Sequence, residues 1–204
     1  MRVRSSKYHW KAMSVVTFAT VFLAATASTL AQGGPYPELN QQLQPLKNQF
    51  NADAGKVRLL LILDPTCPEC RHGASVIRDN VMNKFGSDKL AVYVVWVPLL
   101  NLQDSATLQK HAHGYANLLP PDSRVTHYSD PQSSAGKAYG PIIGVPYGAP
   151  AWDVYLAFGP DARWGDAPPS PSFWEHQLGG VDSNRYLDGP RFAEEVRKLL
   201  ARAQ

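Results

Sequence analysis

The only two cysteines of this chain, Cys67 and Cys70, are separated by two residues and stand at the boundary between two structural patterns. Directly before them lies the apolar run 57–63, which is typical of a strand covered on both faces. Directly after them a helical pattern begins, in which Cys67 can serve as the N-cap and Pro68 suits the first helical position. The sequence therefore predicts a buried strand that leads into a cysteine pair at the start of a helix.

Strand and helix patterns alternate through the rest of the chain. The predicted strands cover residues 57–63, 90–100, 124–128 and 151–158. The predicted helices begin at Pro68, at Asp104 or Ser105, at Ser133 and at Asp188, and the one from Ser133 is expected to end at Tyr139, before a glycine and proline loop over 140–150. A weaker helical stretch within residues 32–55, which Pro45 interrupts, has apolar residues at helical spacing, namely Leu39, Leu43, Leu46 and Phe50. Because a strand, a helix and a second strand in this order form a crossover unit, we expect a parallel or mixed central sheet.

Residues 1–31 have the pattern of a signal peptide. Four basic side chains precede an uncharged stretch of small and apolar residues, and cleavage is expected before Ser28 or Gln32. An uncleaved anchor is the alternative, because ~20 apolar residues can span a bilayer. Either way we expect a periplasmic or secreted protein, on a membrane only if the anchor is kept. The predicted organisation is a signal peptide (1–31), an N-terminal extension that packs on the domain (32–56) and one domain (57–204).

Charge excludes one class of partner. The predicted signal peptide carries four of the 20 Lys and Arg residues and none of the 17 Asp and Glu residues, so the remaining 173 residues have a net charge of −1. No basic stripe is present in the sequence, and nucleic acid is therefore not an expected partner.

The spacing of the cysteines favours a chemical role over a structural one. A disulfide between Cys67 and Cys70 would close a very short loop, and the stabilisation that a disulfide gives grows with loop length. A closed zinc site would need two further ligands beside the two sulfurs. The pattern also fails as a haem attachment motif, because Arg71 stands where C-x-x-C-H requires histidine. We therefore predict no bound cofactor and no dedicated metal site.

A buried strand followed at once by C-x-x-C at a helix start resembles the thioredoxin-like superfamily. The resemblance spans roughly residues 57–200 as an order of elements, and in residues it rests on Cys67 to Cys70. It implies a three-layer α/β fold with a mixed central sheet flanked by helices, here with long loop insertions at 101–147 and 161–187. It also implies a thiol-disulfide oxidoreductase that exchanges disulfides with a protein partner and is itself reduced or oxidised by a redox partner.

Each residue of the motif can be given a role. Cys67, where the helix N–H groups converge, is the predicted exposed nucleophile, with a pKa below the ~8.5 of a free thiol. Cys70 is predicted to resolve the mixed disulfide. Pro68 resembles the residue found in glutaredoxins and periplasmic disulfide oxidases. Glu69 is expected to raise the pKa of the Cys67 thiol and Arg71 to offset this effect, so the direction of electron flow stays open.

The resemblance further implies a cis-proline opposite the cysteines, next to a backbone that can bind an extended peptide. Pro150 is the preferred candidate and Pro146 the second, which makes Ala149 a predicted peptide contact. The sequence departs from thioredoxins in having Thr66 before the first cysteine and Leu61 in place of the buried acid. Asp64, Glu69 or water are then the candidates for proton transfer.

Two functions of other classes remain open at this stage. One is a dithiol that traps soft metal ions such as Cu(I) or Hg(II), for which thiolates are the preferred ligands. The other is a thioredoxin-like interaction module in which the cysteines form an inert disulfide.

Overall fold

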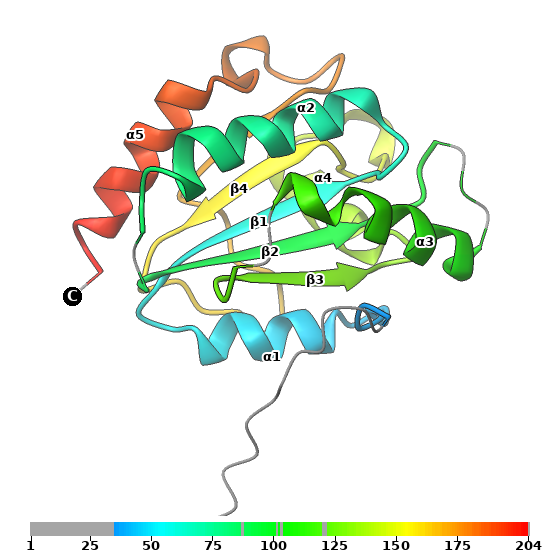
Figure 1. Ribbon diagram of the computed structural model, residues 1–204, viewed down its shortest axis with the longest axis horizontal. Coiled ribbons are helices and arrows are strands. Elements are labelled where there is room, and N and C mark those ends of the chain that lie inside the picture. The colour runs from blue at the N-terminus through cyan, green and yellow to red at the C-terminus, as the bar shows by residue number, and fades with distance from the viewer. Residues whose placement is uncertain (1–34, 87, 101, 103, 120–121, 204) are drawn as a thin grey trace, which may run out of the picture. The chain divides into compact units, whose positions relative to one another are not determined.

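The computed structural model describes residues 35–86, 88–100, 102, 104–119 and 122–203, all within the unit Gln32–Gln204. The predicted signal peptide lies outside the described residues. Five strands form one sheet in the order β3-β2-β1-β4-β5 (Figure 1). The strands are β1 (Val57–Leu63), β2 (Leu90–Trp96), β3 (Val125–Ser129), β4 (Val154–Phe158) and β5 (Phe173–His176).

The sheet is mixed, as expected. Strands β1, β2 and β3 run parallel to one another, whereas β4 is antiparallel to both β1 and β5. All seven residues of β1 and all seven of β2 are buried, which fits strands with helices on both faces. The segment after Pro160 returns as β5, so the predicted excursion there contains a hairpin with β4.

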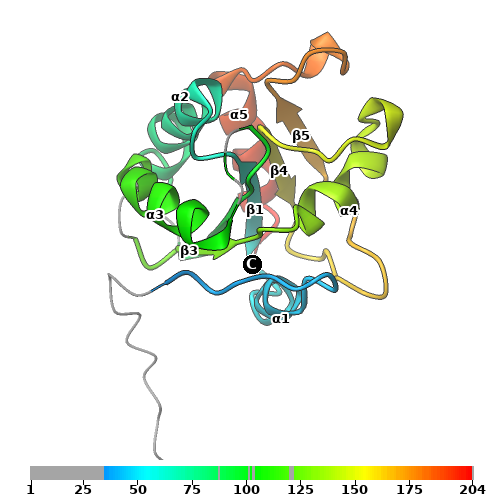
Figure 2. The ribbon, with the colours of Figure 1, turned by 90° about the vertical axis from the view of Figure 1, so that its right-hand side faces the viewer.

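Helices cover both faces of this sheet, and each face has its own apolar cluster (Figures 1 and 2). Side chains of α2, α3 and α5 pack in one cluster, and side chains of α1 and α4 pack in the other. The α/β three-layer architecture is therefore confirmed. The helices are α1 (Gln44–Ala52), α2 (Pro68–Ile77), α3 (Ser105–Tyr115), α4 (Ser134–Ile143) and α5 (Gly189–Leu200), with one π-helical segment, η1 (Arg78–Met82), directly after α2, and three short 3-10 turns, η2 (Ala116–Leu118), η3 (Pro146–Gly148) and η4 (Ser183–Arg185).

Local capping explains where the helices start. Asp104 accepts a hydrogen bond from the backbone N–H of Thr107 at α3, and Asp188 accepts one from the N–H of Arg191 at α5. Pro45 lies in the first turn of α1, where a missing N–H costs nothing, so the proline starts this helix rather than interrupting it.

Three predicted boundaries need correction. Strand β4 begins at Val154 rather than at residue 151. Strand β2 ends at Trp96 rather than at residue 100. Helix α4 continues through Pro141 to Ile143, although we expected a loop from residue 140. Gly144 ends it with a left-handed φ of 75°, a conformation that glycine adopts without steric cost.

The described part of the N-terminal extension, residues 35–56, contributes side chains to one of the two apolar clusters. Its four predicted apolar residues, Leu39, Leu43, Leu46 and Phe50, are at most 3% exposed. At the first of them, the backbone N–H of Leu39 donates to the Ser129 carbonyl at 2.8 Å, so the extension also pairs with the end of β3.

One charged side chain interrupts the apolar pattern of β1. Arg58 is fully buried, and its guanidinium donates to the carbonyl oxygens of Phe50, Gly159 and Ala162. It also lies 4.3 Å from the centre of the Phe50 ring. A buried charge requires such partners, and Arg58 thereby ties α1 to the segment that follows β4.

Among the described residues, no helix combines the length and the apolar character that a membrane crossing requires.

Candidate functional site: a buried dithiol with an aspartate

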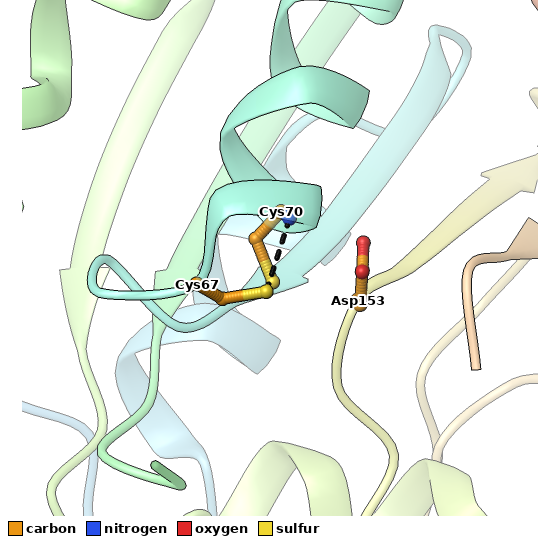
Figure 3. Close-up of side chains that lie close together, drawn as sticks. All are labelled: Cys67, Cys70 and Asp153. Carbon is orange, nitrogen blue, oxygen red and sulfur yellow. Dashed lines mark hydrogen bonds between the residues drawn. The ribbon is translucent and has the colours of Figure 1, made fainter. Parts of the chain in front are cut away.

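The cysteine pair lies where β1 leads into α2 (Figure 3). Cys67 has the extended backbone of an N-cap, and its sulfur accepts a hydrogen bond from the Cys70 N–H at 3.2 Å. Pro68 occupies the first turn of the helix. The predicted local structure is thus confirmed, with both cysteines present as free thiols side by side.

Asp64 secures the corner between β1 and α2. Its Oδ1 accepts hydrogen bonds from the backbone N–H and the hydroxyl of Thr66, both at 2.7 Å. Its Oδ2 accepts from the backbone N–H groups of Leu99 and Leu100, at 2.8 and 2.9 Å. The side chain is fully buried and each oxygen has two donors. This geometry makes Asp64 a structural tie rather than a free proton acceptor.

The helix start favours a thiolate on Cys67. A hydrogen bond from Cys70 is the largest cause that lowers the pKa of the Cys67 thiol, to about 7, and the backbone N–H groups of Glu69 and Cys70 add to it. Burial and the negative charge of Asp153 oppose this effect. A thiol with such a pKa is about half ionised at neutral pH, which suits a nucleophile.

Cys70 has the opposite character. Burial raises its pKa far above that of an ordinary thiol, and the neighbouring Cys67 and Asp153 add to the rise. Cys70 is 1% exposed and Cys67 4%. The prediction that Cys67 is exposed is therefore wrong, because both cysteines belong to the apolar cluster that α2 packs in. Cys67 differs from Cys70 mainly in the ease with which it ionises.

Asp153 approaches the pair from the other side of the site (Figure 3). It lies one residue before β4, is 2% exposed and has a left-handed backbone with a φ of 53°. Burial raises the pKa of its carboxyl to about 6, although hydrogen bonds from Tyr155 and Cys70 oppose the rise. Asp153 was not among the predicted site residues. Its signal in the sequence is a lone acid inside the apolar strand pattern 151–158.

The predicted peptide-binding prolines do not have the expected cis peptide bond. No peptide bond among the described residues is cis, so neither Pro146 nor Pro150 is the expected cis-proline. Pro146 opens a short turn, and residues 149–151 pack against α4, where the Ala151 N–H donates to the Gly136 carbonyl at 2.8 Å. Close packing on α4 requires glycine there, because a Cβ at Gly140 would lie 2.6 Å from the Ala149 carbonyl oxygen. The residue that faces the cysteines is Asp153 instead.

The charged motif residues Glu69 and Arg71 lie in the first turns of α2. The acid whose charge raises the Cys67 pKa is Asp153, while Glu69 contributes its backbone N–H, which lowers that pKa. Arg71 points to α3: it donates to the Tyr115 hydroxyl at 3.0 Å and lies over the ring.

Three groups of this site could hold a metal ion. One ligand atom each from Cys67, Cys70 and Asp153 lies within 4.8 Å of the others, and all three residues are buried. Two thiolates suit soft ions. A closed zinc site requires four ligands, and this cluster supplies three.

The strand order, the parallel β1 and β2, and a C-x-x-C pair at the start of α2 are together those of the thioredoxin-like fold, as the sequence motif implied.

No family model and no curated protein matches the chain. Solved structures to which it is similar include a secreted Mycobacterium tuberculosis disulfide oxidoreductase homologous to E. coli DsbE, at 14% identity and a TM-score of 0.42, covering 72% of this chain and 85% of that one.

Two further structures are similar over comparable lengths. A thiol:disulfide interchange protein of the thioredoxin family from Chlorobium tepidum has 13% identity and a TM-score of 0.47, covering 73% of this chain and 83% of that one. BsSco, a member of the Sco family of cytochrome c oxidase assembly proteins, has 14% identity and a TM-score of 0.43, covering 82% of this chain and 92% of that one.

Proposed function

We propose that this protein is an extracytoplasmic thiol-disulfide oxidoreductase that exchanges disulfides with a protein partner through Cys67 and Cys70. The observation that carries the proposal is the contrast between the two thiols. Cys67, hydrogen-bonded by the first turn of α2, has a pKa of about 7, whereas burial keeps Cys70 protonated. The Cys67 sulfur can thus attack a partner disulfide as a thiolate, whereas Cys70 stays protonated until it resolves the mixed disulfide.

The oxidation of a reduced partner and the reduction of an oxidised one use the same bonds in opposite order. In the reducing direction, the Cys67 thiolate attacks a partner disulfide, forms a mixed disulfide and releases one partner thiolate. Cys70 then loses its proton to the adjacent Asp153 carboxylate and attacks the Cys67 sulfur. The Cys67–partner bond breaks, the second partner sulfur leaves as a thiolate and the Cys67–Cys70 disulfide forms. Two electrons pass to the partner.

The extracytoplasmic setting rests on the sequence. The signal-peptide pattern of residues 1–31 supports export, and disulfide chemistry persists in oxidising compartments. A second protein, an upstream reductant or oxidant, is needed to restore the starting state of the pair after each cycle. No bound cofactor takes part in the proposed steps.

The pH dependence of alkylation tests this proposal. The rate at which iodoacetamide modifies Cys67 in the reduced protein should rise with pH and reach half its maximum near pH 7, because only the thiolate reacts. Cys70 should stay unmodified over the same range, because burial raises its pKa. Mass spectrometry assigns the sites, and equilibration with glutathione buffers gives the reduction potential. A midpoint near that of a free thiol, ~8.5, or a pair that never forms a disulfide would contradict the proposal.

Replacing Asp153 by Asn should separate the two steps. The resolution step should slow by about 100-fold, the usual contribution of a general base. The alkylation midpoint of Cys67 should fall below pH 7, because the Asp153 charge raises the Cys67 pKa. Stopped-flow kinetics of each step measure both effects. The exposed helix cap Asp104→Asn is the control, and equal slowing of both steps in Asp153→Asn would argue against this role.

A second candidate function is soft-metal binding, which the cluster of Cys67, Cys70 and Asp153 favours. Titration of the reduced protein with Cu(I) in competition with a chelator should then show one ion bound tightly, with binding lost when both cysteines are serine. If the protein binds Cu(I) only weakly, and Asp153→Asn does not change this binding, the metal-binding function is contradicted and disulfide exchange is the only supported function.

A further inference from the structure

Asp153 belongs to a buried polar network that joins β4, the end of β5 and the start of α2. The hydroxyl of Tyr155, a fully buried side chain on β4, donates to Asp153 Oδ1 at 2.7 Å. Because the Tyr155 hydroxyl hydrogen is directed to Asp153, the hydroxyl oxygen can only accept a further hydrogen bond. The neighbouring Gln177 therefore faces it with the amide nitrogen. In this orientation the two N–H hydrogens of Gln177 are shared among three acceptors, with the nitrogen 3.1 Å from Asp153 Oδ1 and 3.0 Å from both the Glu69 carbonyl and the Tyr155 hydroxyl oxygen.

Both donors bind the same carboxylate oxygen. Tyr155 and Gln177 converge on Oδ1, and no hydrogen bond from either reaches Oδ2. The Gln177 bond to the Glu69 carbonyl ties this arrangement to the turn of α2 that carries Cys70. The carboxylate is therefore fixed in rotation and in its position relative to that turn.

Gly73 in α2 makes room for this network. A Cβ at position 73 would lie 1.8 Å from the Tyr155 hydroxyl oxygen and 2.3 Å from the Gln177 amide. Glycine inside a helix costs about 0.5–1 kcal/mol relative to alanine. The helix thus carries a destabilising residue at a position where a side chain would collide with the tyrosine and the amide.

We propose that Tyr155 and Gln177 are positioning residues for the resolution step: they orient the Asp153 carboxylate toward Cys70 and hold it in register with α2. This role rests on the proposed disulfide exchange. It affects only the step in which the Cys70 proton passes to Asp153 and the Cys70 sulfur displaces the partner from Cys67. The first attack by Cys67 uses N–H groups of α2 and is independent of Tyr155 and Gln177.

An aromatic disulfide reagent such as Ellman's reagent observes the two steps separately. Attack by Cys67 on the reagent releases the first coloured thiolate, and attack by Cys70 on the resulting mixed disulfide releases the second. In Tyr155→Phe and in Gln177→Leu, the second phase should slow by about 10-fold, since a hydrogen bond to a charged group is lost, while the first phase keeps its rate within about 2-fold.

Tyr93→Phe is the matched control. Tyr93 is 1% exposed, lies on β2 and also donates to an aspartate, Asp53, at 2.8 Å, but it packs in the other apolar cluster. This variant should leave both phases unchanged. In an Asp153→Asn background, Tyr155→Phe should have no further effect on the second phase, because a positioning residue acts through the group that it positions.

The outcomes separate this inference from the proposed function. Unchanged second phases in Tyr155→Phe and Gln177→Leu, equal slowing of both phases, or full additivity with Asp153→Asn would each overturn the positioning role. A wild-type protein that releases no second thiolate would instead overturn disulfide exchange itself.

Discussion

Cys67→Ser should reduce disulfide exchange to the background rate. Removal of a catalytic nucleophile lowers the rate by ~10³–10⁶-fold, so we expect a loss of about 1000-fold or more. The hydroxyl of serine stays protonated at neutral pH, whereas the pKa of Cys67 is about 7. Insulin reduction and the oxidation of a dithiol peptide both measure the loss. Wild-type protein carried through the same steps is the control.

Cys70→Ser should behave differently, because the first attack does not need Cys70. The variant should capture its partner as a mixed disulfide on Cys67 and release it slowly, since the buried resolving sulfur is gone. Mass spectrometry under non-reducing conditions identifies the captured protein. Trapping on Cys70 in the Cys67→Ser variant, or activity that survives Cys67→Ser, would reverse the assignment of the two sulfurs.

The largest loss of stability is expected for Asp64→Ala. Removing this buried carboxylate leaves the N–H groups of Thr66, Leu99 and Leu100 without their acceptor. Each such N–H group costs about 1–3 kcal/mol when it stays unpaired. The free energy of unfolding should therefore fall by ~3–5 kcal/mol. Urea unfolding, followed by circular dichroism, gives the free energy of unfolding.

Two other aspartate variants serve as references for the loss of stability in Asp64→Ala. Asp64→Asn keeps an oxygen acceptor and should cost less than Asp64→Ala. Asp104→Ala removes the exposed cap of α3 and should cost ~1 kcal/mol, the usual value for an N-cap. If Asp64→Ala costs no more than Asp104→Ala, then Asp64 does not secure the corner between β1 and α2.

The sequence predicted what local patterns determine. The apolar runs predicted β1 and β2, and the cap and proline pattern predicted the start of α2 at the cysteines. These features depend on neighbours in the chain. The continuation of α4 through Pro141 was missed, because its packing with residues 149–151 is a tertiary contact that outweighs the proline signal.

The site was predicted only in part for the same reason. Cys67 and Cys70 are adjacent in sequence, but Asp153 reaches them through the antiparallel pairing of β4 with β1. Tyr155 reaches the site through the same pairing, because it lies on β4, and Gln177 reaches it from the segment after β5. The resemblance to thioredoxins led to the cis-proline expectation, yet in this chain that region packs on α4 with trans bonds.

Both outer edges of the sheet are partly occupied by the chain itself. At β3, the N-terminal extension exchanges hydrogen bonds with the Ser129 backbone. At β5, the Leu187 N–H donates to the His176 carbonyl at 2.8 Å, and Arg185 donates to the Trp174 carbonyl at 3.3 Å. Unpaired edge strands are templates for aggregation. Self-capping of both borders thus limits edge-to-edge association between copies of the chain.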